Sequence, residues 1–259
     1  KERGKVSTEF LDVRFEPSIS KFLVNRHHDP LKFQERFMQL LEDTSIQDYD
    51  SVGMFMTSSN QFRQVKLFSR IINENFPSIN VIIGGTHPTA VPGDFSSNPS
   101  THEVVIIGDP GKPLLDLLHS GKLGRPKKRE GTDFMVSEHS LDLDVLPFPD
   151  YDSYLNKYGS EDKFNLTIRA SKGCPFNCKF CRIVKSNLKN FSSHVFKERF
   201  EKLREIVLKY KKKKKKISFS DQTFNSAILS KKILQFIINN GLQETYRFSC
   251  QTRIEIVSK

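Results

Sequence analysis

Apolar residues along the chain alternate between short continuous runs and helical spacing, which predicts strands and helices in turn. In the first half, apolar runs bounded by turn residues predict strands at 9–15, 51–56 (SVGMFM), 79–85 (INVIIGG) and 103–108 (EVVIIG). Apolar residues three or four positions apart predict helices at 31–41 and 62–72, with shorter ones near 88–97 and at 113–119. Such alternation is typical of a parallel sheet covered on both faces. Residues 1–120 are therefore predicted to form an open α/β domain.

The composition then changes. Residues 121–162 are rich in Lys, Arg, Gly, Pro and Asp and lack helical spacing, which indicates an interdomain connection. Regular patterns resume over residues 163–259, with strands predicted at 164–170, 217–220 and 245–252 and helices at 196–207 and 228–237. Three such repeats cannot close a β/α barrel. Either the sheet stays open or the chain is a fragment, and we favour a fragment because the first predicted strand lacks the strand and helix that usually precede it.

Composition and charge narrow the class of protein. The 259 residues are 37% hydrophobic, enough for one large domain or two ordinary ones. Neither a long apolar run nor a signal peptide is seen, and four unevenly placed cysteines do not form a secreted disulfide framework, so we expect a cytoplasmic protein without a membrane span. Much of the net charge of +11 comes from Lys209 and the run Lys211 to Lys216. A lysine run at a helix end is usually solvated, so nucleic acid is disfavoured as a partner.

Three of the four cysteines lie together in SKGCPFNCKFCR, residues 171–182, with C-x3-C-x2-C spacing. Adjacent thiolates on a loop are typical of a metal or cluster site, because the ion offsets their charge. Zinc normally takes four protein ligands, and the fourth would have to be His194 or Cys250. A four-iron cluster held by Cys174, Cys178 and Cys181 alone would keep one iron open. The spacing favours iron over zinc.

With Gly173 before the first cysteine and Phe180 before the third, this loop closely resembles that of radical S-adenosylmethionine (radical SAM) enzymes. The resemblance implies that Cys174, Cys178 and Cys181 hold a 4Fe-4S cluster whose open iron binds S-adenosylmethionine. It also implies that Phe180 lies near the adenine. Reductive cleavage would give a 5'-deoxyadenosyl radical, with a flavodoxin or ferredoxin as electron donor. Residues 163–259 would then be the first part of a radical SAM β/α partial barrel.

A segment after the second strand of this barrel also resembles the family. SFSDQTFN, residues 218–225, lies where family members help to hold the methionine part of S-adenosylmethionine, which makes Asp221 and Phe224 candidate contacts. Gln222 replaces the second acidic residue that many members have at that position. Alternatively, Asp221 is simply the N-cap of the next helix.

The first domain suggests a second cofactor. INVIIGGTHPTAVP, residues 79–92, resembles the strand and glycine turn of cobalamin-binding domains in the cobalamin-dependent radical SAM group, and LPFPDYD (146–152) resembles the connector of that group. The resemblance implies a Rossmann-like open parallel sheet in which the cobalamin-binding residues are Gly84, Gly85, Thr86, His87 and Gly108. Phe55 departs from the small hydroxyl residue that is common in the group. GGTHPTA also fits a generic turn of a doubly wound sheet, and His87 an ordinary turn residue.

Together these features predict a cobalamin-dependent radical SAM enzyme, most simply a methyltransferase acting on an unactivated carbon of a small-molecule substrate. A cobalamin-dependent cyclase or rearrangement enzyme is an alternative, and a zinc-stapled nucleic-acid-binding module is an alternative of another class. A tRNA methylthiotransferase is disfavoured, because such enzymes carry further cysteines in the N-terminal domain and residues 1–173 contain none.

Overall fold

The structure is a computed structural model in which the chain forms two compact units, Lys1–Ser140 and Leu141–Lys259. Each unit has a hydrophobic core of its own. The described residues are 8–9, 11, 29–96, 102–120, 131–137, 141–159, 165–181, 186–210, 215–224 and 228–257. Most of the strand predicted at 9–15 and Lys211 to Lys214 of the lysine run lie outside these residues.

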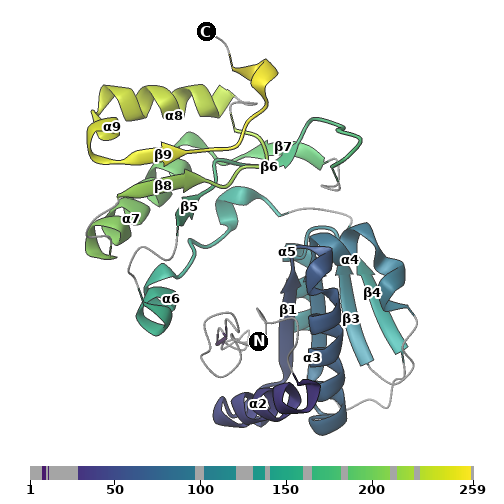
Figure 1. The fold of residues 1–259 in the computed structure, drawn as a ribbon. Coiled ribbons are helices and arrows are strands. Elements are labelled where there is room, and N and C mark those ends of the chain that lie inside the picture. Colours follow the sequence, from purple (N-terminus) through teal and green to yellow (C-terminus); the bar gives the residue numbers. More distant parts are fainter. Residues whose placement is uncertain are drawn as a thin grey trace. The chain divides into compact units, whose positions relative to one another are not determined.

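The first unit is built on a four-stranded parallel sheet with the order β1-β2-β3-β4 (Figure 1). Its strands are β1 (Ser51–Met56), β2 (Asn80–Gly85), β3 (His102–Ile107) and β4 (Gly131–Val136). The register sets Phe55 beside Gly84 and Met56 beside Gly85 at the carboxyl ends of β1 and β2. An α/β fold with a parallel sheet is thereby confirmed for this unit.

Helices cover both faces of this sheet. They are α2 (Pro30–Asp43), α3 (Phe62–Asn75), α4 (Thr86–Ala90) and α5 (Gly111–His119), with 3-10 turns η1 (Ile46–Asp48), η2 (Ser59–Gln61) and η3 (Pro92–Phe95). Apolar residues of α2 and α3 pack with Val81 and Ile83 on one face, and Leu117 of α5 packs with Ile82 and Ile106 on the other. Alternate residues of β2 thus enter two cores, as expected for a strand buried on both sides.

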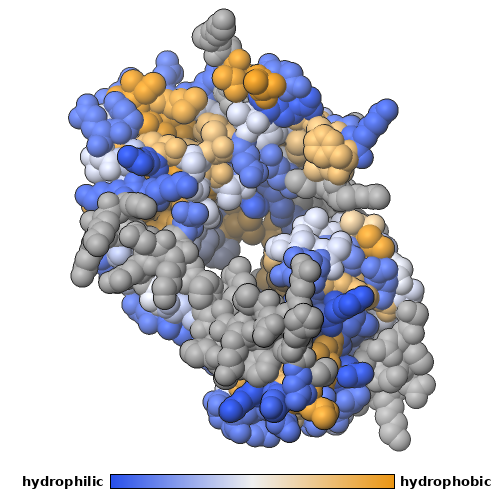
Figure 2. All heavy atoms as spheres, in the orientation of Figure 1, coloured by the Kyte–Doolittle hydropathy of each residue, from blue (hydrophilic) through white to orange (hydrophobic). Residues whose placement is uncertain are grey.

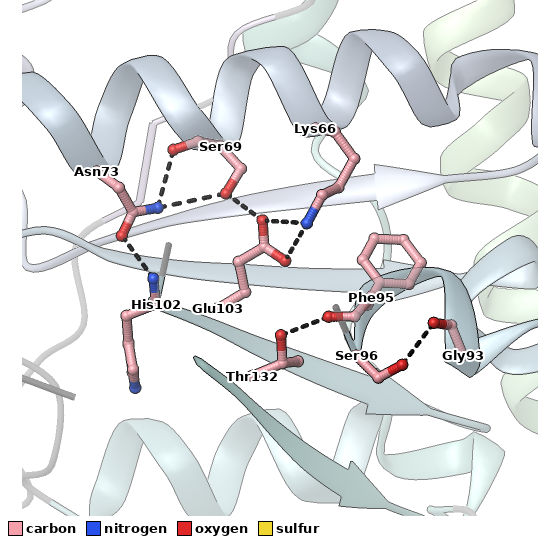
Figure 3. Close-up of polar contacts among 9 residues, drawn as sticks. All are labelled: Lys66, Ser69, Asn73, Gly93, Phe95, Ser96, His102, Glu103 and Thr132. Carbon is pink, nitrogen blue, oxygen red and sulfur yellow. Dashed lines mark hydrogen bonds and ion pairs between the residues drawn. The ribbon is translucent and has the colours of Figure 1, made fainter. Parts of the chain in front are cut away.

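A buried ion pair ties α3 to β3 (Figure 3). The Glu103 side chain is fully buried, and Lys66 Nζ donates to its two carboxylate oxygens at 3.1 and 3.0 Å. Ser69 also donates to Glu103, while Asn73 donates to Ser69 O at 2.8 Å and accepts the His102 N–H at 3.0 Å. Because a buried charge is tolerated only when it is paired, this network fixes how α3 lies against β3.

The second unit contains a parallel sheet with the order β5-β8-β9 and an antiparallel hairpin, β6-β7 (Figure 1). The strands are β5 (Leu166–Ile168), β6 (Ser171–Cys174), β7 (Ser186–Asn190), β8 (Lys216–Phe219) and β9 (Arg247–Ser249). The helices are α6 (Tyr151–Tyr158), α7 (Ser193–Tyr210), α8 (Ile228–Asn239) and α9 (Leu242–Thr245), with 3-10 turns η4 (Leu143–Val145) and η5 (Ile254–Ile256). Phe200 of α7 and Ile233 of α8 share a core with Ile217 of β8.

The two faces of the β5-β8-β9 sheet differ in chemistry. Ile217 and Phe219 are buried in the core with the helices, whereas the alternate register row carries the hydroxyls of Thr167, Ser218 and Ser249. Ser218 Oγ and Ser249 Oγ are 2.8 Å apart and hydrogen-bonded. Because successive residues of a strand point to opposite faces, the sheet presents a polar face away from its core.

Three elements lie in the segment predicted as a connection, residues 121–162: the 3-10 turn η4 and two longer elements, β4 and α6. Strand β4 pairs with β3 through Gly131–Val136, and α6 begins after Asp150, whose side chain accepts the Ser153 N–H at 3.0 Å. Both elements bury little: Val136 is 65% exposed, and Leu155 is the buried residue of α6. Their apolar pattern is correspondingly weak, which explains why the sequence did not predict them.

Other predicted elements differ in extent. The helix expected near 88–97 is two shorter ones, α4 and η3, and the last strand spans Arg247–Ser249 rather than 245–252. The strand expected to run straight into the cysteine loop divides into β5 and β6, and β6 turns to pair with β7. Within the described ranges, no helix has the length and apolarity needed to cross a membrane.

Apolar side chains also reach the surface of the second unit. Figure 2 shows them over α8 and around η5, where the exposed residues are Leu234, Ile238, Ile254 and Val257.

Lys209, in the last turn of α7, is paired with Asp152 at 2.6 Å. This basic residue therefore stabilises the helix end and the contact with α6, as its position at the negative end of the helix dipole favours.

Candidate functional site

The cysteine loop begins on β6, where regular strand pairing breaks down. The register between β6 and β7 shifts between Lys172 and Cys174, and Gly173 has a φ of 98°. This left-handed conformation suits glycine and turns the chain into the loop. Cys174, Cys178 and Cys181 are all partly exposed, and the Cys181 N–H donates to Cys178 O at 3.0 Å. The sequence thus places three accessible thiols on one short loop.

Asp221, which follows β8, braces the base of this loop. Its buried carboxylate accepts the Ala170 N–H at 3.1 Å and both the N–H and the hydroxyl of Ser171 at 2.5 Å. These bonds tie the end of β8 to the junction between β5 and β6. The cofactor contact of Asp221 stays a prediction, and the hydrogen bonds give the residue a role in positioning the loop.

Phe224, the other residue predicted near S-adenosylmethionine, lies in the core. It is 3% exposed, and its ring centroid is 4.5 Å from that of Phe219. Its N–H donates to Gln251 O at 2.7 Å, and Thr252 Oγ1 donates to its carbonyl at 2.6 Å. The segment after β8 is therefore fastened to the segment after β9.

Arg253, in that second segment, reaches the cysteine loop. Its Nη1 donates to Cys178 Sγ at 3.3 Å, and its guanidinium carbon lies 4.4 Å from the Phe176 ring centroid. Nη2 and Nε donate to Glu255 at 2.8 and 3.2 Å. These bonds hold the pKa of Glu255 down at about 2, and they are the main cause that raises the pKa of Arg253. No local sequence pattern indicates this contact, because it joins residues 75 positions apart.

The thiols are brought together on the loop but not into metal-ligand geometry. Among the described residues, no three His, Cys, Asp or Glu side chains are close enough to hold a metal ion. The ring of Phe180, predicted near the adenine, is 89% exposed. As a donor set, three soft sulfurs on one loop with a guanidinium N–H to one of them suit an iron–sulfur cluster.

The two residues that could complete a zinc site are placed differently. The His194 side chain is 82% exposed on α7 and interacts with Glu198 at 3.8 Å. Burial, followed by the charge of Asp221, raises the pKa of the Cys250 thiol.

In the first unit, the glycine turn lies at the carboxyl ends of β2 and β3. Gly85 has a φ of 121°, and a Cβ there would stand 2.2 Å from Met56 O, so the position accepts only glycine. Gly108 has a φ of 92°, and its N–H donates to Thr89 Oγ1 at 2.9 Å. Thr89 Oγ1 in turn donates to Gly85 O at 2.8 Å. Thr89, which the sequence did not single out, therefore links the two turns.

Gly84 leaves space on the α5 face of the sheet. A Cβ at Gly84 would meet only Ile106 Cβ, at 4.0 Å. Phe55, its register partner on β1, is 66% exposed. Thr86, next in the turn, is exposed as well. Bare backbone beside an exposed aromatic ring at the carboxyl end of parallel strands is the kind of place where α/β sheets bind cofactors.

His87 is held inside the turn. His87 is 6% exposed. Its Nδ1 is 2.9 Å from Ser59 Oγ, within hydrogen-bond distance. Its Nε2 is 3.0 Å from Asp94 Oδ2, but this contact lacks hydrogen-bond geometry. The centroid of its ring lies 5.5 Å from that of Phe62 and 6.1 Å from that of Phe95. Both ring nitrogens face protein groups, which suits a residue that positions the turn.

Comparison with known proteins gives one informative relative. The chain is 30% identical over 190 residues to a protein of Pyrococcus horikoshii named an uncharacterized methyltransferase. The match covers 68% of this chain and 40% of that protein, so the comparison extends over less than half of the relative. No family model and no solved structure matches the chain.

Proposed function

We propose that this chain carries the cluster-binding and cobalamin-binding parts of a cobalamin-dependent radical SAM enzyme that methylates an unactivated carbon of a small molecule. The observation that carries the proposal is the three-cysteine loop on β6, braced by Asp221 and contacted by Arg253. The glycine turn of the first unit and the methyltransferase name of the relative support it.

In the second unit, we assign separate roles to the three cysteines, Asp221 and Phe180. Cys174, Cys178 and Cys181 would supply three sulfur ligands to a 4Fe-4S cluster, which would leave one iron available to S-adenosylmethionine. When bound, the cluster supplies the electron for reductive cleavage of S-adenosylmethionine. Asp221 fixes the β5–β6 junction from which the loop starts, and the exposed Phe180 ring is available to the adenine.

In the first unit, the ligand would lie over the carboxyl ends of β1 and β2. The absence of a side chain at Gly84 lets the corrin or its nucleotide tail approach the backbone beside Phe55. When bound, cobalamin supplies the methyl group. Gly85 and Gly108 keep their turns tight through Thr89, and His87 holds the turn from within.

We assign the substrate to the polar face of the β5-β8-β9 sheet. The hydroxyls of Thr167, Ser218 and Ser249 form one row across its strands. A parallel sheet with apolar residues on one face only requires solvent or a polar ligand on the other, since parallel strands usually bury apolar residues on both faces. Hydroxyl donors and acceptors there would orient a polar small molecule.

The test uses the full-length protein, reconstituted anaerobically with iron, sulfide and hydroxocobalamin. The expected result is iron and sulfide in equal amounts, retained corrin, and cleavage of S-adenosylmethionine with reduced flavodoxin or ferredoxin. Cys174→Ala should lose the iron, whereas Cys250→Ala, the matched variant outside the loop, should keep it. Zinc without iron or sulfide would instead favour the zinc-stapled module, and cleavage without retained corrin would remove cobalamin from the proposal.

A further inference from the structure

Arg253 contacts the middle of the cysteine loop from a distant part of the sequence. It follows β9, and its guanidinium meets three groups: the Cys178 sulfur at 3.3 Å, the Phe176 ring at 4.4 Å and Glu255 at 2.8 Å. The side chain is 37% exposed. A surface arginine with a single partner would be free to rotate, whereas three partners that use different atoms restrict this guanidinium.

The three partners use different properties of the guanidinium. The guanidinium carbon lies over an aromatic ring, Nε and Nη2 donate to a carboxylate, and Nη1 donates to sulfur. Lysine has neither the plane nor the fork and could satisfy only part of this set. Phe176 and Cys178 both belong to the loop, so the contact anchors the loop at two side chains.

From this geometry we infer that Arg253 is a positioning residue for the cluster: it holds Cys178 in place and donates a charged N–H to its sulfur. The inference rests on the proposed function, since it concerns the thiol as a cluster ligand. Hydrogen bonds to ligand sulfurs are among the features that set cluster potentials. A fixed cation beside the sulfur favours the reduced cluster, which carries one more negative charge.

This contact predicts the direction in which the midpoint potential of the cluster changes when Arg253 is replaced. Without the Arg253 N–H, the cluster should be harder to reduce, and its midpoint potential should move to a more negative value. Loss of one charge-assisted hydrogen bond should change the reduction equilibrium on the order of tenfold, or about 59 mV for a one-electron couple. A purely structural arginine would change cluster content without moving the potential of the clusters that form.

The experiment compares Arg253→Gln and Arg253→Lys with wild type in the full-length, anaerobically reconstituted protein. Iron and sulfide per chain are measured first, and the midpoint potential is then found by redox titration followed by electron paramagnetic resonance. Arg253→Gln should show the full negative shift and Arg253→Lys a smaller one. Arg247→Gln is the matched control, because Arg247 is an exposed arginine on β9. Its replacement should leave the midpoint potential of the cluster unchanged.

The outcomes separate this inference from the proposed function. Wild type without a cluster defeats the proposed function and the inference with it. If the wild type binds a cluster and Arg253→Gln has the same midpoint potential as Arg247→Gln, the inference is overturned and the proposed function is not. Should Arg253→Gln fail to fold by circular dichroism, the decision passes to Arg253→Lys: a negative shift supports the inference, and an unchanged potential overturns it.

Discussion

The buried carboxylate of Asp221 accepts the backbone N–H of Ser171 at 2.5 Å, three residues before the first cysteine of the loop. The bond joins residues 50 positions apart and fixes where the loop leaves the sheet. Arg253 holds the same loop near its middle through Cys178. The loop is therefore positioned by the segments that follow β8 and β9.

Replacing Asp221 with asparagine should destabilise the chain. The carboxylate accepts two backbone N–H groups, and an amide presents one oxygen to them, so one buried donor loses its acceptor. The expected loss in the free energy of unfolding is about 1–3 kcal/mol, measured by urea denaturation. Asp152→Asn, which removes an exposed carboxylate from its contact with Lys209, is the control and should have a much smaller effect. Equal losses for the two variants would contradict the bracing role.

A methyl group at Gly85 should not be tolerated. Gly85→Ala introduces a Cβ at 2.2 Å from Met56 O in a left-handed backbone conformation, which forces the turn to move. The free energy of unfolding should fall by more than about 1 kcal/mol. Gly53→Ala on neighbouring β1 meets nothing within 4 Å and should be neutral or slightly stabilising. A Gly85→Ala protein as stable as Gly53→Ala would show that the turn is not fixed as described.

Breaking the buried pair of Lys66 and Glu103 should be costly. Lys66→Met leaves the fully buried Glu103 without its cation, with an expected loss of about 3–5 kcal/mol. The double variant Lys66→Met/Glu103→Leu removes both charges and should lose less than the single variant. Lys112→Met, which breaks an exposed pair with Asp116, should cost at most about 0.5 kcal/mol. A double variant less stable than Lys66→Met would argue against a desolvated pair.

The carboxyl of Glu255 should titrate far below its ordinary range. Hydrogen bonds from Arg253 lower its pKa from 4.5 to about 2. Since the pKa in the folded chain is depressed, the interaction stabilises the fold fully above pH 4.5 and is lost as the pH falls toward 2. Carbon-13 NMR of the carboxyl should give this low value in wild type and an ordinary one in Arg253→Gln. An ordinary value in wild type would show that the pair does not form in solution.

The sequence predicted the elements whose apolar pattern is strong. SVGMFM is β1, an edge strand of which Met56 is buried, and INVIIGG contains β2, which is buried along most of its length, as expected inside a parallel sheet. It did not predict β4 or α6, which bury few side chains. The spacing of apolar residues reflects which side chains are buried, so elements that bury few side chains have only a weak apolar pattern.

The candidate site was predictable in part for a similar reason. The cysteine spacing is local and can be read directly, and the resemblance of SFSDQTFN to a radical SAM segment makes Asp221 a candidate. Its partners, Ala170 and Ser171, and the contact of Arg253 with Cys178 depend on which strands become neighbours. Sequence alone does not show such long-range pairings, so it could name the candidate ligands but not the residues that hold their loop in place.

The central claim, that three cysteines hold a cluster with an open iron for S-adenosylmethionine, is tested most directly by electron paramagnetic resonance of the reduced, reconstituted full-length protein. The account predicts a cluster signal that changes when S-adenosylmethionine is added and that disappears in Cys174→Ala, Cys178→Ala and Cys181→Ala but persists in Cys250→Ala. A signal that S-adenosylmethionine leaves unchanged, or zinc bound in place of iron and sulfide, would contradict it.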